Sequence, residues 1–452
     1  MNVALPPECL TWQDAQGQEH RALWHSESGV ALPTRFQLVD DTLTADSALR
    51  LASAGVSLIW QGDFHNAKML LQAMGRRMAT RAEKSKKPVK KKAPAATATS
   101  SDNAEAFSPA SAPVFPHAFH LYRQATAQRA QILGRLLVPL TSDWEIPLRR
   151  APDIKAAVQQ AWGSPSQSKT AAGASESTDH LVSLRELQGL IGAYEWRRQG
   201  VEIPALNPGP NNRIYPHYGV FSPIRGEYID LVADAPLPVL PTLPEGARSL
   251  RAFDIGVGTG VLSAVLARRG VQHIIATDLD PRALACAADN LQRLRCSGAV
   301  TLLAANLFPD VEAMASDSPF RASPAFASLH PAAPLQADLI VCNPPWLPGK
   351  PSSPIEGAIY DFNSQMLKGF LAQAKAHLSP HGEAWLILSD LAEHLGLRTR
   401  EALLGWIAAG GLQVLGRMDT RAKHPKAMDP TDPLYAARSA ELTSLWRLGH
   451  LV

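Results

Sequence analysis

The chain has 452 residues, of which 46% are hydrophobic and 19% charged, and its formal net charge is +3. This length and balance allow one sizeable core and a second, smaller module. The sequence holds no run near the roughly 20 continuous apolar residues of a membrane span, and its first residues lack the parts of a secretory signal. We therefore expect a cytoplasmic protein without a membrane partner.

The four cysteines stand far apart and show no CxxC spacing. The sequence therefore indicates neither a zinc site nor a disulfide framework, and we expect reduced, buried thiols and no bound metal. Cys342 ends an apolar run that begins at Leu339. This setting favours a strand interior over a nucleophile, because a reactive thiol needs accessible, electropositive surroundings.

The first 80 residues contain two segments in which apolar residues recur at helical spacing, Ser47 to Trp60 and Asn66 to Met78. This pattern predicts a small folded module over residues 1–80. Residues 81–114 are rich in Lys, Ala, Thr, Ser and Pro and contain almost no large apolar side chain. Such a composition cannot offset the entropy lost on ordering, so it predicts a disordered linker.

Basic residues are concentrated at the start of this linker. Arg76 to Lys92 holds nine basic residues and one acid, and without the +8 of this tract the rest of the chain carries −5. A basic stripe on a folded face is typical of nucleic-acid binding, whereas a Lys-rich run in a low-complexity segment is typical of a solvated linker. Composition favours the linker and leaves contact with nucleic acid open.

Helical patterns return over residues 115–213, for example from Phe119 to Leu137 and from Leu181 to Trp196, with a Ser/Ala/Gly-rich break from Gly163 to Asp179. We expect a helical region with a flexible insertion, beside the domain that follows. We find no internal repeat of the kind that marks solenoids or propellers.

Residues 214–452 alternate between β-type and helical segments. The β-type runs are Arg251 to Ile255, His273 to Thr277, Val300 to Ala304, Ala337 to Cys342 and Ala384 to Leu388, followed by Leu412 to Met418 and Glu441 to Leu448. The first five predict a parallel, doubly wound sheet with its ligand site at the carboxyl ends of the strands. The last two predict an antiparallel pair at the sheet edge. The Ala/Ser/Pro-rich stretch 310–336 is expected to be a surface insertion.

A glycine-rich turn follows the first strand, with Asp254 two positions before Gly256 and further glycines at Gly258 and Gly260. A helix is expected from Val261. Glycine lets the backbone turn sharply and approach a ligand where a side chain would collide. A dinucleotide site would show Gly-x-Gly-x-x-Gly, but here the third glycine comes one residue early. These residues are therefore candidates for binding another small ligand.

Carboxylates stand at the ends of the first two strands. Asp254 discourages a phosphate and suits a cation, which favours S-adenosylmethionine, whose sulfonium and ammonium groups are positive, over NAD. Asp278, within Thr277-Asp278-Leu279-Asp280, can accept hydrogen bonds from two ribose hydroxyls. The alternative is an ordinary tight turn in which Asp278 and Asp280 cap the next helix.

The fourth strand leads into Asn343-Pro344-Pro345-Trp346. Two prolines stiffen the loop and remove two amide donors, which leaves carbonyl acceptors. The Asn343 side-chain oxygen and the Pro344 carbonyl can then accept both N–H bonds of a planar nitrogen and aim its lone pair at a methyl carbon. Trp346 is expected to stack on the flat substrate. We therefore predict that Asn343, Pro344, Pro345 and Trp346 form the catalytic centre.

These motifs resemble those of the class I methyltransferases of the small-domain group. The resemblance is carried by Phe253 to Gly260, Thr277 to Asp280 and Asn343 to Trp346, and it covers roughly Tyr218 to the carboxyl end. The group includes release-factor glutamine methyltransferases and ribosomal or transfer RNA enzymes that modify exocyclic amines. The resemblance implies S-adenosyl-L-methionine as cofactor and a Rossmann-like, mostly parallel seven-stranded sheet, here with a smaller, largely helical amino-terminal region.

The resemblance also implies two further cofactor contacts. At the end of the third strand this group typically places an acid for the adenine amino group, and here Asn306 offers a side-chain oxygen instead; it can equally stabilise a turn. The segment from Tyr218 to Glu227, which we term the lead-in segment, resembles the part of these enzymes that covers the cofactor. Glu227 is thus a candidate cofactor contact or, equally, an acid at a helix start.

Two classes of methyl acceptor fit. Leu347-Pro348 after the motif is similar to the glutamine-modifying branch, whereas Trp346 in place of the usual Tyr and the long front half are departures from it. The extra amino-terminal module is similar in arrangement to RNA enzymes with a separate recognition domain. We predict N-methylation of a nucleic-acid base, with RNA favoured, ahead of a protein glutamine amide and of a non-enzymatic binding module.

Overall fold

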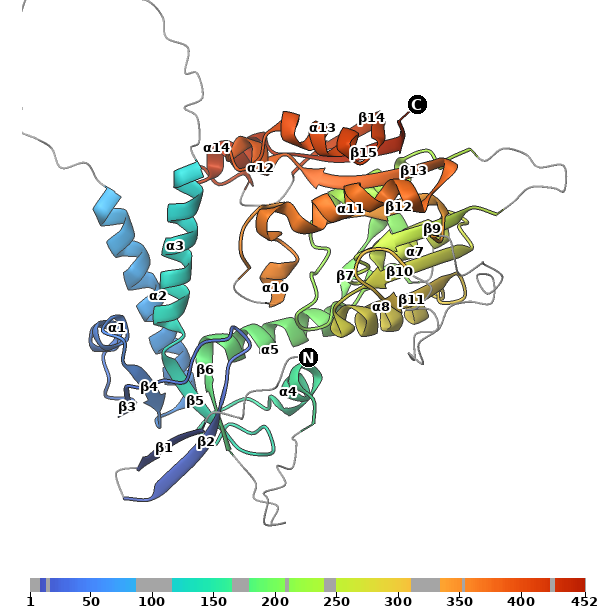
Figure 1. Cartoon of the computed structure of the whole chain (residues 1–452). Helices are drawn as coiled ribbons and strands as arrows, with labels where there is room; N and C mark the ends of the chain where they lie inside the picture. The colour runs from blue at the N-terminus through green and yellow to red at the C-terminus, as the bar shows by residue number, and fades with distance from the viewer. Residues whose placement is uncertain are drawn as a thin grey trace, which may run out of the picture. The chain divides into compact units, whose positions relative to one another are not determined.

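The computed structural model of the chain describes residues 9–13, 17–86, 116–164, 179–207, 211–239, 249–309, 334–351, 354–422 and 427–451. The chain divides into two compact units (Figure 1), of which unit 1 comprises Met1–Pro113 and His120–Ile191, and unit 2 comprises Val114–Phe119 and Gly192–Val452. Most of the predicted linker, the center of the predicted flexible insertion and most of the predicted surface insertion lie outside the described residues.

Unit 1 contains a six-stranded sheet in the order β1-β2-β6-β5-β4-β3. Its strands are β1 (Cys9–Gln13), β2 (Glu19–His25), β3 (Phe36–Val39), β4 (Ser57–Trp60), β5 (Leu136–Leu140) and β6 (Asp179–Ser183). The helices of this part of the chain are α1 (Ala45–Ser53), α2 (Phe64–Lys86), α3 (Pro116–Leu133), α4 (Lys155–Trp162) and α5 (Leu184–Gln199). Each segment predicted to be helical contains a helix, but Ser47 to Trp60 ends in β4, Phe119 to Leu137 ends in β5, and Leu181 to Trp196 begins in β6, so the prediction was wrong for these strands.

This sheet differs from the predicted division into a module over 1–80 and a helical region over 115–213. β4 pairs in parallel with β5, and β2 pairs in parallel with β6, so the two segments share one sheet. All four residues of β4 are buried. A strand buried on both faces is a continuous apolar run, which periodicity cannot distinguish from a buried stretch of helix.

Unit 2 contains a seven-stranded sheet in the order β11-β10-β9-β12-β13-β15-β14. Its strands are β9 (Arg251–Ile255), β10 (His273–Asp278), β11 (Val300–Ala304), β12 (Ala337–Cys342), β13 (Leu378–Ser389), β14 (Leu412–Arg421) and β15 (Leu442–His450). The first five are parallel, and β15 runs antiparallel to both β13 and β14. The predicted doubly wound sheet and its antiparallel edge are both confirmed.

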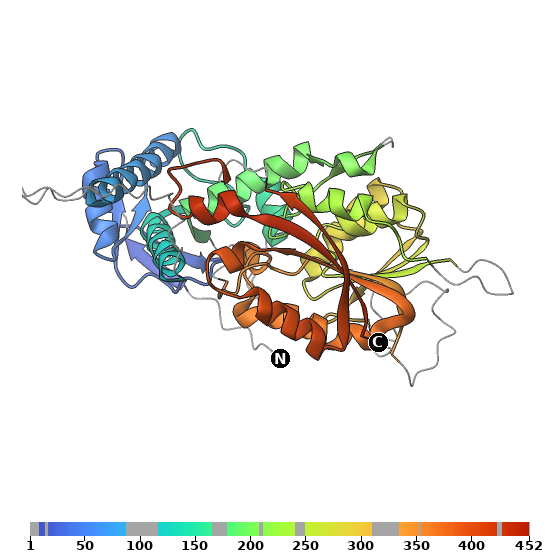
Figure 2. The same cartoon turned by 90° about the horizontal axis from the view of Figure 1, so that it is seen from above.

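The remaining elements of unit 2 are mostly helices. They are α6 (Glu227–Asp234), α7 (Val261–Arg268), α8 (Pro281–Arg293), α10 (Pro354–Gly357), α11 (Gln365–His377), α12 (Leu391–His394), α13 (Arg400–Ala409) and α14 (Tyr435–Ala440), with a two-stranded ribbon of β7 (Val201–Glu202) and β8 (Arg213–Ile214). Figure 2 shows α11 and α13 on one face of the sheet and the helices from α6 to α8 on the other. No described helix is long and apolar enough to cross a membrane.

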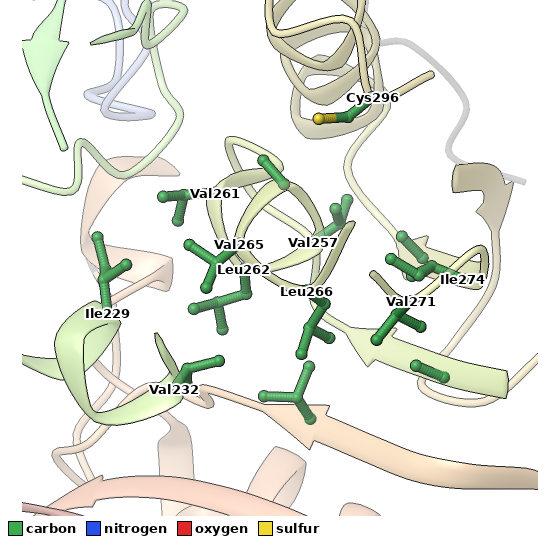
Figure 3. Close-up of a cluster of buried hydrophobic side chains, with 14 of the residues drawn as sticks. Ile229, Val232, Val257, Val261, Leu262, Val265, Leu266, Val271, Ile274 and Cys296 are labelled. Atoms are coloured by element: carbon green, nitrogen blue, oxygen red, sulfur yellow. The ribbon is translucent and has the colours of Figure 1, made fainter. Parts of the chain in front are cut away.

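The sheet is buried on both faces, and β12 shows how. Leu339 and Val341 belong to the core beneath α6, α7 and α8, whereas Ile340 and Cys342 belong to the core beneath α11 and α13. Successive side chains of a strand point to opposite faces, so an unbroken apolar run serves both cores. Figure 3 shows side chains of α7 facing Ile229 and Val232 of α6 in the first of these cores.

The parallel register brings three strand ends together. Ile255 of β9 is aligned with Thr277 of β10 and with Cys342 of β12. The glycine-rich turn, Asp278 and Asn343 therefore follow at the same edge of the sheet, where parallel sheets bind their ligands.

Candidate cofactor and acceptor site

Each glycine of the turn after β9 has a backbone conformation that L side chains rarely adopt. The φ angles are +79° at Gly256, +51° at Gly258 and +81° at Gly260. A Cβ atom added at Gly260 would lie 3.2 Å from Cα of Ala287, whereas one at Gly258 would meet nothing within 4 Å. Gly260 therefore permits close packing of α8 on the turn, and Gly258 presents bare backbone to open space, as a closely approaching ligand requires.

The glycine turn is held by the end of β10. The Thr277 carbonyl accepts hydrogen bonds from the backbone N–H groups of Gly256, at 2.9 Å, and Val257, at 2.8 Å. Asp278 Oδ2 accepts a third bond, from the Gly258 N–H at 3.0 Å. The turn is thus fixed by the neighbouring strand without help from a ligand.

Asp278 is positioned to accept further hydrogen bonds. Its Oδ1 accepts from the Asp280 N–H at 3.0 Å, and each carboxylate oxygen can accept more than one bond. Burial raises the pKa of the Asp278 carboxyl, while the bonds from Asp280 and Gly258 oppose this shift. Asp280 instead caps α8 by accepting from the Arg282 N–H at 2.9 Å. The capping alternative therefore applies to Asp280, and Asp278 combines bracing of the turn with capacity for ligand hydroxyls.

Asp254 does not lie open at the strand end. It is 1% exposed, and its Oδ2 accepts from the Ser263 N–H at 3.0 Å and the Ser263 hydroxyl at 2.6 Å. Burial raises the pKa of Asp254 to about 6, although the bonds from Ser263 lower it. The carboxylate thus satisfies the amino-terminal turn of α7, where a negative charge is favourable. The sequence pattern could not show this burial, and a contact with a cationic ligand stays a prediction.

The two residues assigned through the resemblance lie in different settings. Asn306 is exposed just after β11, where the Ala305 N–H donates to the Asp278 carbonyl at 3.2 Å, so it stands beside the Asp278 edge. Glu227 is 9% exposed at the start of α6 and lines a cavity of about 250 Å³ with Glu202 and Asp230. Asn306 therefore lies close to Asp278, the candidate for binding the ribose hydroxyls. Glu227 instead faces an acidic cavity.

The acceptor motif is ordered by a hydrogen bond between its ends. Trp346 Nε1 donates to Asn343 Oδ1 at 2.8 Å. Pro344 is buried, and Asn343, Pro345 and Trp346 are half-buried. The Trp346 ring packs against the cores on both faces of the sheet, so it is fixed rather than free to turn. The predicted stacking of Trp346 on a substrate stays a prediction.

The neighbouring thiol is inert. Cys342 is fully buried, and burial raises its pKa well above the usual value, with the charges of Asp254 and Asp361 acting in the same direction. A neutral, enclosed thiol is a poor nucleophile, in agreement with the strand-interior interpretation.

A segment that the sequence patterns do not mark as functional braces the acceptor loop, which comprises Asn343 to Leu347. The Leu347 N–H donates to the Ile359 carbonyl at 3.2 Å, and the Leu347 carbonyl accepts from the Asp361 N–H at 2.9 Å. The Asp361 carboxylate accepts from the N–H groups of Met366, at 3.0 Å, and Leu367, at 3.1 Å. An acid shortly before the apolar start of α11 was the available signal, of the kind that marks a helix start.

The comparisons with known proteins agree with this geometry. Residues 211–400 match the family model of the methyltransferase small domain. A release factor glutamine methyltransferase from Cereibacter sphaeroides is 32% identical over 186 residues, which are 39% of this chain and 59% of the relative. A tRNA1(Val) (adenine(37)-N6)-methyltransferase from Shewanella loihica is 28% identical over 173 residues, 37% of this chain and 60% of the relative. The chain thus spans about three fifths of the length of these relatives.

A solved methyltransferase structure from Pyrococcus furiosus is 16% identical, with a TM-score of 0.33, over 57% of this chain and 98% of that chain. The strand order of unit 2 and the family match over residues 211–400 agree with the expected Rossmann-like methyltransferase fold. Residues 211–400 are thus similar to methyltransferase small domains, in agreement with the resemblance seen in the sequence.

Proposed function

We propose that unit 2 transfers a methyl group from S-adenosylmethionine to a planar nitrogen, and that the acceptor is an exocyclic amino group of a nucleic-acid base, with RNA favoured. The observation that carries the proposal is the alignment of Cys342 with Ile255, which sets Asn343 beside the glycine turn. A hydrogen-bond acceptor for the substrate and a turn that admits a ligand thus adjoin at one sheet edge.

The residues fit the cofactor. Gly258 leaves open space where a side chain would otherwise stand. Asp278 offers carboxylate oxygens for ribose hydroxyls, and Asn306 offers an oxygen for the adenine amino group. When bound, S-adenosylmethionine supplies an electrophilic methyl group on a sulfonium sulfur.

The residues of this chain orient the acceptor nitrogen toward the methyl group. Asn343 Oδ1 and the Pro344 carbonyl accept the two N–H bonds of the acceptor nitrogen, so its lone pair points toward the methyl carbon. These acceptors bind more strongly as the nitrogen gains positive charge, which lowers the barrier. The methylated nitrogen becomes acidic and loses its proton late, to water or another weak acceptor, so no strong base is required.

The test is methyl transfer with a radiolabelled cofactor to fractionated cell lysate. Label removed by nuclease supports a nucleic-acid acceptor. Label removed by protease supports the second candidate, a glutamine amide, which the likeness to a release factor glutamine methyltransferase and Leu347-Pro348 favour. Cofactor binding without any labelled product in the lysate would support a binding module instead.

A further inference from the structure

The segment Phe362-Asn363-Ser364, which joins the acceptor loop to α11, has an uncommon backbone. Asn363 has φ 56° and ψ 22°, and Ser364 has φ 54° and ψ 41°. Both lie in the left-handed region, and consecutive residues with side chains rarely adopt it. Such conformations persist only where the surroundings hold them, and they cluster at functional sites.

Hydrogen bonds hold the start of this segment, and the residues after it lie near the glycine turn. Asp361 is fixed to Leu347, the residue after Trp346, through a backbone bond of 2.9 Å, and the Ser364 N–H donates to the Asp361 carbonyl at 2.9 Å. On the other side, Met366 Cε lies 3.1 Å from where a Cβ atom of Gly256 would stand. Phe362 therefore belongs to a short bridge between the acceptor motif and the glycine turn.

Phe362 is exposed although it is aromatic. It is 49% exposed, whereas Phe253 and Phe370 in the adjoining core are 0% exposed. An exposed ring beside a site offers apolar surface that a flat ligand can cover, and covering it removes that surface from water. The two residues that follow Phe362, Asn363 and Ser364, have the constrained left-handed conformations.

We propose that Phe362 determines acceptor specificity by stacking on a nucleobase. This inference rests on the proposed methyl transfer and names its acceptor class. A base offers a wide π-face and an amino group in one plane, so it can contact Phe362 while its nitrogen meets Asn343. A glutamine amide has no such face and hangs on a flexible aliphatic chain. Aromatic side chains are the usual platforms for unpaired bases.

The test compares the full-length protein with three variants, using bulk RNA from cells that lack the protein as acceptor. Phe362→Ala should raise the KM for RNA by roughly 10-fold or more, as loss of a stacking ring does. Phe362→Tyr keeps the ring and should restore the KM to near that of the wild type. Leu404→Ala, at another exposed apolar residue on α13, 41% exposed, should leave it unchanged.

Calorimetry should show unchanged cofactor affinity in all three variants. An unchanged KM in Phe362→Ala, or a KM as high in Phe362→Tyr, would overturn the stacking role. If the wild type labelled protein and not RNA, the assignment of a nucleobase as acceptor would be overturned. The proposed methyl transfer would not be affected. A wild type that neither binds S-adenosylmethionine nor labels any fraction would overturn the proposed function itself, and this inference with it.

Discussion

Trp346 Nε1 donates a hydrogen bond to Asn343 Oδ1 at 2.8 Å, which sets the orientation of the Asn343 carboxamide. An indole N–H can only donate, so it selects the amide oxygen and not the amide nitrogen. The oxygen has a second lone pair, which stays available for an N–H of the acceptor. The Trp346 ring, which packs against the cores on both faces of the sheet, thus also orients the proposed catalytic oxygen of Asn343.

Asn343→Ala should lower turnover by ~10²–10³, by analogy with the loss of one oriented group at a site of developing charge. Asn343→Asp should lose less, because an acceptor oxygen remains. Cofactor affinity should change little in either variant, since the contacts are with the acceptor nitrogen. Near-normal turnover by Asn343→Ala would remove the residue from catalysis, and a joint loss of thermal stability and cofactor affinity would assign it to loop structure.

Trp346→Phe should lower turnover by about 2- to 13-fold, which corresponds to one hydrogen bond of ordinary strength. The ring remains, so substrate stacking and thermal stability should be largely retained. Trp406→Phe on α13 is a matched control, because this ring packs against the core beneath Lys368. Equal turnover of both variants would show that the indole N–H does not orient Asn343.

Asp278→Ala should weaken S-adenosylmethionine binding by about 1.5–3 kcal/mol, the range for hydrogen bonds to a charged group. Asp280→Ala is the control, since Asp280 caps α8 and should cost about 1 kcal/mol of stability with little effect on cofactor affinity. Titration calorimetry and thermal unfolding of both variants separate the two effects. Unchanged affinity in a folded Asp278→Ala protein would exclude Asp278 from the cofactor site.

Gly258→Ala should reduce cofactor affinity, whereas Gly260→Ala should reduce the stability of the fold. At Gly260 the new methyl group would press on Ala287 and Leu291, so we expect a loss of about 1–3 kcal/mol in stability, as for overpacking. At Gly258 it would enter open space, so the protein should fold with modest backbone strain and lose cofactor affinity. Gly258→Ala with normal affinity would contradict ligand approach at this glycine.

Asp254 should make stability depend on pH. Its pKa is raised from 3.8 to about 6 in the folded protein, so folding takes up a proton between these values. The contribution of this group to stability is therefore greatest below pH 4, falls as the pH rises through 6, and is constant above, a change of about 3 kcal/mol. Asp254→Asn should lack this step. If the free energy of unfolding had the same pH dependence in the two proteins, the assignment of this step to Asp254 would be contradicted.

The sequence predicts unit 2 far better than unit 1. Three strands of unit 2, β9, β10 and β12, are largely apolar and lead into Gly256, Asp278 and Asn343. Such strand ends can be recognised from the sequence alone. In unit 1, β4 is four residues long and its partner β5 follows some distance later, so neither periodicity nor spacing marks the pair.

Within the site, residue types were predictable and their partners were not. Asp254 stands where a ligand contact is expected, but only the packing of α7 shows that Ser263 takes its carboxylate. The bond between Trp346 and Asn343 likewise depends on rotamers that the sequence does not specify.

The three bonds that tie Gly256, Val257 and Gly258 to the end of β10 have a thermodynamic consequence. The glycine turn reaches its shape when the sheet forms, so the loss of backbone entropy at these residues belongs to folding and not to ligand capture. An arriving ligand meets a rigid surface, and its binding free energy is not reduced by ordering this turn. Association should then require no rearrangement of the turn, and the free and bound proteins should share it.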